Sequence, residues 1–199
     1  MSIATDAIVD EKFQQWTRGK DAVEARISIY ERIRDIPYAV IPELIDAERY
    51  ADILTLGRGS CTPKHFLLCN MFQRLGILVL FAVYPFRWGE RAEVLDEYPQ
   101  QLGKLAEDLP LSHHLACKAE IDGRLVIVDA TLDPPLGKVD LPVNRHWDGF
   151  SDTLLPMNPC GEEELYHPSE AHLMKPRSDR PWLEFYAELN ACLEEVRRS

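Results

Sequence analysis

Apolar residues recur every three or four positions in several parts of the chain, and this spacing predicts amphipathic helices. Residues 20–34, 63–75 and 181–198 show it most clearly, and shorter helical segments are expected near Phe13 and over residues 43–54. The core-facing positions of the helix over 20–34 are Val23, Ile27, Tyr30 and Ile33. The seam of the last helix comprises Trp182, Phe185, Leu189, Cys192 and Val196. We expect this last helix to have a purely structural role.

Strands are predicted where short apolar runs are bounded by turn residues. Residues 77–84 are apolar throughout, which is typical of a strand that is buried on both faces. Residues 113–121 and 124–131 flank Asp122-Gly123, a dipeptide that favours a two-residue hairpin turn. Residues 134–180 are rich in proline and polar turn residues, and we expect them to wrap the domain with few regular elements.

A glycine-rich turn, Gly57-Arg58-Gly59-Ser60, leads into Cys61 at the predicted start of a helix. Pro63 follows in the first turn, a position that proline favours. The N-terminus of a helix carries a positive partial charge and unpaired N–H groups, and both stabilise a thiolate. We therefore expect Cys61 to be a nucleophile.

The hairpin brings a histidine and a carboxylate to one face of the predicted sheet. With a two-residue turn at Asp122-Gly123, His114 lies diagonally across from Asp129. Such neighbours are roughly 7–8 Å apart at the backbone, within reach of an imidazole and a carboxylate. His113 has the opposite parity and points to the apolar face. Asp133 has the same parity as Asp129, so either carboxylate could orient His114.

A metal site is the alternative for the cysteine helix, because Cys61, His65 and Cys69 recur every four residues. Eight residues of helix rise about 12 Å, whereas two thiolates on one zinc ion lie within about 4 Å of each other. The three residues therefore cannot share one ion. A pairing of His65 with Cys61, or a contribution from His113 and Cys117, is left open.

Composition narrows the choice of partners. The chain has 199 residues, long enough for one domain with a sizeable core, and its formal net charge is -11. That charge argues against nucleic acid and against an anionic membrane surface. No run approaches the about 20 apolar residues of a membrane-spanning helix. Five cysteines without regular spacing do not suggest a disulfide framework, so a reducing cytoplasm is expected. The oligomeric state is not indicated.

Three motifs resemble the transglutaminase-like superfamily, the papain-related Cys-His-Asp group. They are Gly59-Ser60-Cys61 entering a helix that ends in Arg74-Leu75-Gly76-Ile77, His114 eight residues before Asp122-Gly123, and Asp129-Ala130-Thr131. The resemblance covers roughly residues 20–135. It implies an α+β, cysteine-proteinase-like fold with the cysteine helix packed on an antiparallel sheet. It also implies Cys61 as nucleophile, His114 as general base and acid, and Asp129 as orienting carboxylate.

We therefore expect a single domain over residues 1–199 that acts as a thiol-dependent amide or acyl hydrolase, or as an acyltransferase, through a thioester on Cys61. The substrate would be a peptide, an amide or a small acyl compound, and no cofactor or metal is expected. Arg58-Gly59 and Val128-Asp129-Ala130 are similar to elements of the more distant arylamine N-acetyltransferases, so CoA-dependent N-acyl transfer is an alternative. Ala116 stands where the superfamily often has an aromatic residue, and this departure favours a non-catalytic binding module as the other alternative.

Overall fold

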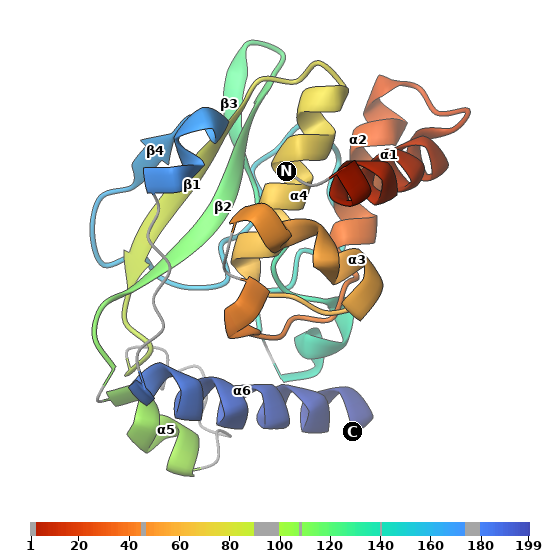
Figure 1. Cartoon of the computed structure of the whole chain (residues 1–199). Coiled ribbons are helices and arrows are strands. Elements are labelled where there is room, and N and C mark those ends of the chain that lie inside the picture. The colour runs from red at the N-terminus through yellow and green to blue at the C-terminus, as the bar shows by residue number, and fades with distance from the viewer. Residues whose placement is uncertain (1–2, 45–46, 90–99, 108, 140, 174–179) are drawn as a thin grey trace.

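Four strands form an antiparallel sheet in the order β3-β2-β1-β4, and the helix that begins with Cys61 packs against it (Figure 1). The computed structural model describes residues 3–44, 47–89, 100–107, 109–139, 141–173 and 180–199. The strands are β1 (Val79–Phe86), β2 (Ser112–Ile121), β3 (Arg124–Val128) and β4 (Glu164–Tyr166). The expected α+β fold with an antiparallel sheet is confirmed.

The helices are grouped on one side and at one end of the sheet. They are α1 (Ile3–Thr17), α2 (Ala22–Arg34), α3 (Ile53–Leu56), α4 (Cys61–Arg74), α5 (Gln100–Glu107) and α6 (Arg180–Arg198). Short 3-10 segments are η1 (Pro42–Leu44), η2 (Ala47–Asp52), η4 (Pro134–Val139) and η5 (Pro168–Leu173). In Figure 1, α1 to α3 lie beside α4, whereas α6 crosses the end of the sheet where β1 finishes and β2 begins. None of the described helices is both long and apolar enough to cross a membrane.

The β2–β3 hairpin has the turn that its sequence predicts. Asp122 and Gly123 have φ values of 52° and 75°, the left-handed conformation that both central residues of a type I′ turn require. Ile121 pairs with Arg124 across the turn, so the predicted register is confirmed. The ladder ends at Val128, three residues earlier than predicted, and the following residues leave β2 and approach the start of α4.

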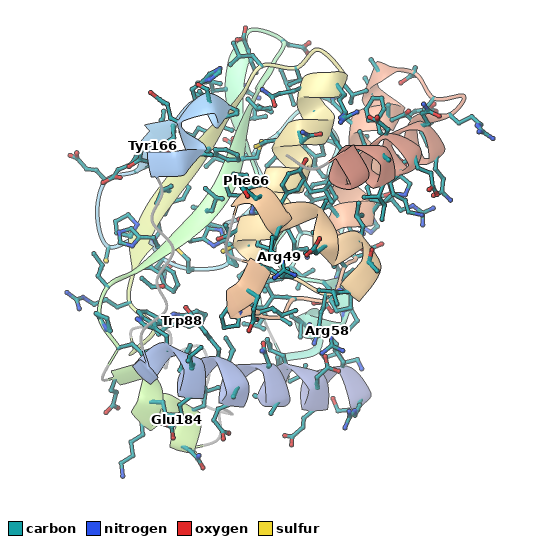
Figure 2. All side chains as sticks on the ribbon, viewed as in Figure 1. Arg49, Arg58, Phe66, Trp88, Tyr166 and Glu184 are labelled. Atoms are coloured by element: carbon teal, nitrogen blue, oxygen red, sulfur yellow. The ribbon has the colours of Figure 1, made fainter. Side chains whose placement is uncertain are left out.

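Adjacent residues of β2 enter two separate cores because successive side chains point to opposite faces of a sheet. Leu115 belongs to a core with α4, whereas Ala116 belongs to a core with α6. Figure 2 labels one aromatic residue of each core. Phe66 packs in the α4 core, and Trp88 lies beside α6 with its ring centroid 4.9 Å from that of Phe185. The sheet is therefore held from two sides.

The buried face of α2 differs from the predicted stripe. Val23 and Ile27 are only half-buried, and two arginines that hydropathy would place outside are buried instead. Arg26 stacks over the ring of Phe150 with 4.4 Å to its centroid, and Arg34 donates hydrogen bonds to carbonyls of residues 144 and 145. The helix is rotated toward this distant loop, which periodicity within α2 cannot reveal.

Other predicted boundaries move by a few residues. β1 begins at Val79 rather than at residue 77 because the Ile77 N–H closes the end of α4 by donating to the Phe72 carbonyl over 3.0 Å. The helix expected over 43–54 is divided among η1, η2 and α3. A cap on the last helix at Ser178 or Asp179 lies outside the described residues.

Candidate active site

Cys61 is the first residue of α4, and Pro63 lies in its first turn, as the sequence predicts. Ser60 precedes it in an extended conformation and makes no side-chain capping hydrogen bond. The first N–H groups of a helix have no partner within the helix, so they and the helix dipole favour negative charge at this position. Cys61 as a residue is half-buried.

The glycine turn before Cys61 is fixed by backbone pairing and by a close approach. Gly59 donates to the Pro37 carbonyl over 3.1 Å, and its own carbonyl accepts from the Ala39 N–H over 3.2 Å. A Cβ at Gly59 would lie 2.6 Å from Cγ2 of Ile53, which is fully buried. Glycine is required here because any side chain would displace either Ile53 or the turn that holds the cysteine.

His114 and Asp129 are joined by a hydrogen bond of 2.5 Å from Nε2 of the ring to Oδ2 of the carboxylate. Both side chains are buried. Asp129 is held in place because its Oδ1 accepts from the Thr131 N–H over 2.9 Å and its own N–H donates to Oγ1 of Thr153 over 2.7 Å. The carboxylate is therefore oriented before any substrate arrives, and Nδ1 of His114 is left to face the thiol.

Asp133, the other carboxylate that the sequence allows, contacts different residues. Its Oδ1 accepts from the Tyr38 N–H over 2.8 Å, and Arg197 donates to both of its oxygens over 2.7 and 2.9 Å. Burial raises its pKa, but Arg197 and the Tyr38 N–H outweigh this and hold the pKa below its usual range. Of the two candidates, Asp129 is the one that the structure brings to His114.

The three site residues are electrostatically coupled. Burial disfavours the thiolate of Cys61, but the charge and hydrogen bond of His114 and the Leu115 N–H lower the pKa of this thiol. Burial likewise disfavours the imidazolium of His114, but Asp129 and Cys61 outweigh it and raise the pKa of His114. Asp129 keeps a lowered pKa, because the charge of His114 and its hydrogen bond outweigh the cost of burial. The arrangement favours a thiolate–imidazolium pair.

His65, considered above as a metal ligand, has both ring nitrogens occupied by the backbone. Nδ1 lies 2.8 Å from the Cys61 carbonyl, and Nε2 accepts from the Ala130 N–H over 3.0 Å. The ring is fully buried, and burial lowers its pKa to about 4. Within the described ranges, no group of three histidine, cysteine or acidic side chains could hold a metal ion.

We expect the buried, neutral His65 to make the fold less stable in acid. Because its pKa is about 4 in the fold and about 6.5 in the unfolded chain, the unfolded chain binds more protons between these pH values. The free energy of unfolding should therefore fall as the pH falls through this window, by up to about 3 kcal/mol. Urea denaturation at several pH values gives the free energy of unfolding of the wild type and of His65→Gln, whose side chain does not titrate. The difference between the two pH slopes is the contribution of His65. Equal pH slopes in the two proteins would contradict the expectation.

Lys64 is a residue that sequence reasoning missed. It is fully buried, and its ammonium donates to the carbonyls of Arg34, Ile36 and Thr131 over 3.0, 2.8 and 2.7 Å. These three bonds use all three of its donors. Burial lowers its pKa to about 7 although Asp133 and other carboxylates oppose the shift. One sequence signal could have indicated that Lys64 is buried. Apolar residues follow it at three, four and seven positions, so it lies on the buried stripe of α4.

The other cysteines differ from Cys61 in their surroundings. Cys69 and Cys117 are buried in the α4 core, and burial, together with the hydrogen bond between them, raises the pKa of Cys69. Both therefore act as small core residues. Cys160 is exposed, and its backbone N–H donates to the Pro85 carbonyl over 2.8 Å.

Comparison with known proteins adds little to this geometry. No protein-family model matches the sequence, and no curated protein matches it. Among solved structures, the chain is similar to a "Putative Cysteine Protease from Cytophaga hutchinsonii", with a TM-score of 0.43 and 19% sequence identity. The match covers 67% of this chain and 39% of that one, so the chain spans about two fifths of that protein. At this level of similarity the match carries no argument about chemistry, which depends on the site alone.

Proposed function

We propose that this protein is a cysteine-nucleophile enzyme that cleaves an amide or acyl bond through a thioester on Cys61. The supporting observation is one chain of contacts at the start of α4, in which the thiol meets His114 and His114 meets Asp129 at 2.5 Å. A thiolate is the nucleophilic form of cysteine, and a helix N-terminus beside an imidazolium is a setting that produces it.

In the first half of the reaction, Sγ of Cys61 attacks the carbonyl carbon of the substrate. A C–S bond forms, and the π electrons of the carbonyl move to its oxygen. The Cys61 backbone N–H, which has no partner within the helix, is a donor for this oxyanion. His114 then gives the proton on Nδ1 to the leaving group, the carbonyl re-forms, and the bond to the leaving group breaks.

In the second half, His114 is neutral at Nδ1 and accepts a proton from water as the water attacks the thioester carbon. The C–S bond breaks, the acid product leaves, and the thiolate–imidazolium pair is restored. Asp129 accepts the hydrogen bond from Nε2 in both halves, and it thereby keeps Nδ1 directed at the reacting atoms.

Within this class, we place the chain with the transglutaminase-like group, because the order of cysteine helix, histidine strand and aspartate after the hairpin follows that resemblance. Hydrolysis of a peptide, amide or small acyl compound is favoured over cross-linking, since no feature of the described residues marks a site for an acceptor amine. Transfer from acetyl-CoA would use the same thioester and a different donor.

The test is acylation of Cys61 by a small activated ester. Incubation with p-nitrophenyl acetate, followed by peptide mass spectrometry, should find one acetyl group on the Cys61 peptide and none on the Cys160 peptide. Cys160 is the more exposed cysteine, so its acetylation shows how far an accessible but unactivated thiol reacts. A Cys61→Ala variant should show no acetylation, and a Cys160→Ala variant should match the wild type.

The course of nitrophenolate release separates the alternatives. Release beyond one equivalent per protein indicates hydrolysis, and diversion of the acetyl group to an added primary amine indicates transfer. Acetylation by acetyl-CoA in place of the ester would support the CoA-dependent alternative. A wild-type Cys61 that remains unacetylated would refute the proposal and favour a binding module.

A further inference from the structure

His65 connects the two segments that carry the ends of the Cys61–His114–Asp129 contact chain. It contacts the Cys61 carbonyl in the first turn of α4, and it contacts the N–H of Ala130, the residue that follows Asp129. The contacts therefore form a closed ring: Cys61 contacts His114, His114 contacts Asp129, and the Ala130 N–H next to Asp129 contacts His65, which contacts Cys61. A ring of this kind resists a shift of α4 relative to Asp129 better than the single contact chain does.

The hydrogen bonds of His65 allow one tautomer. A carbonyl oxygen can only accept, so Nδ1 must carry the proton that Cys61 accepts. A backbone N–H can only donate, so Nε2 must present a lone pair to Ala130. The ring is fully buried and lies edge-on to the ring of His114, with 6.0 Å between centroids. No second arrangement satisfies both backbone groups.

The neutral form of His65 also protects the hydrogen bond of the acid. Nε2 of His65 lies 3.9 Å from Oδ2 of Asp129, the oxygen to which His114 is bonded. A proton on this nitrogen would displace the Ala130 N–H and would compete with His114 for that oxygen. The charged groups facing the ring are Asp129, His114 and Lys64, and burial dominates them in keeping the ring neutral.

We propose that His65 is a positioning residue for the reaction. It holds the first turn of α4, which carries Cys61, and the segment that carries Asp129 at the spacing that pairs Cys61 with His114. It touches neither the substrate nor the reacting atoms, so its effect passes through the Cys61 thiol and the Asp129 carboxylate. The inference rests on the proposed function, because it requires that the thiol be activated by His114.

The test is the pH profile of Cys61 alkylation by iodoacetamide in His65→Leu, His65→Gln and the wild type. Leucine removes both hydrogen bonds, and the midpoint of the profile should move upward by about one pH unit, with about a tenfold lower rate at low pH. Glutamine can still accept from the Ala130 N–H, so it should recover part of the shift. A stabilising but purely structural histidine would lower the melting temperature and leave the midpoint unchanged.

A matched control separates loss of stability from loss of positioning. Phe72→Leu leaves a cavity beside Trp147 on the same helix, and Phe72 does not take part in the ring of contacts. This variant should lower the melting temperature without moving the midpoint of the alkylation profile. If His65→Leu does not fold, His65→Gln and His65→Asn, which each keep one of the two bonds, carry the comparison. Folded variants with the wild-type midpoint would overturn the inference. A wild type with an ordinary, unreactive Cys61 would instead overturn the proposed function.

Discussion

Replacing His114 by alanine is expected to lower the rate at which iodoacetamide alkylates Cys61 at about pH 6 by about tenfold or more. An ordinary thiol with a pKa near 8.5 is only about 0.3% ionised at that pH. The charge and hydrogen bond of His114 outweigh burial and lower the pKa of Cys61, so we expect a larger ionised share for the wild-type thiol. The gain in rate is smaller than the gain in thiolate, because a less basic thiolate is a weaker nucleophile.

His113→Ala is the matched control for this experiment. The two histidines are adjacent in β2, but His113 is exposed and His114 is buried against Asp129. Peptide mass spectrometry at several times gives the rate for each cysteine separately, so exposed Cys160 serves as an internal reference. The expectation fails if His114→Ala and His113→Ala label Cys61 equally fast, or if the wild-type Cys61 reacts no faster than Cys160.

Replacing Asp133 by alanine is expected to lower the free energy of unfolding by about 3–5 kcal/mol, the usual cost of removing one partner of a buried ion pair. The change would leave the guanidinium of Arg197 without its main partner and would remove the hydrogen bond that Asp133 accepts from the Tyr38 N–H. The side chain of Asp133 is 2% exposed and that of Arg197 is 12% exposed, so water compensates little. For a chain of this size, the melting temperature should fall by about 10 °C.

Glu194→Ala tests the same arginine from its exposed side. Glu194 also pairs with Arg197, at 2.9 Å, but its side chain is 35% exposed. Its removal should cost less than about 1 kcal/mol, as is usual for ion pairs near the surface. Chemical denaturation of the two variants under one set of conditions gives the comparison. Similar losses for Asp133→Ala and Glu194→Ala would show that burial does not set the strength of this contact.

The predictions from sequence that held rest on local chemistry. Asp122 and Gly123 specify the hairpin turn, and the turn specifies the register in which Ile121 pairs with Arg124. Asp129 directly follows the last paired residue, Val128, and from there its carboxylate reaches His114. The glycine turn and Pro63 mark the helix that begins at Cys61. In each case the residues that decide the structure are close together in the sequence, so a pattern of a few residues is sufficient.

The features that sequence could not supply depend on partners far along the chain. Lys64 bonds to carbonyls about thirty residues before it and 67 residues after it, and Asp133 meets Arg197 across 64 residues. The local pattern puts Lys64 on the buried stripe of α4 but does not identify the carbonyls that it binds, and it does not reveal that Asp133 pairs with Arg197. The choice between Asp129 and Asp133 belongs to the same class, since it depends on Arg197 from α6 occupying one of the two carboxylates.

The separation between the hairpin and the cysteine helix has a consequence for how reactivity arises during folding. His114 and Asp129 are only 15 residues apart on one hairpin, a kind of unit that forms within microseconds. Cys61 lies on a different element and meets this pair only after α4 has docked on the sheet. A newly made or partly unfolded chain therefore carries an ordinary, weakly reactive thiol. Under the proposed function, the thiol becomes reactive only when the fold is complete, and its labelling rate is then expected to measure the fraction of native protein.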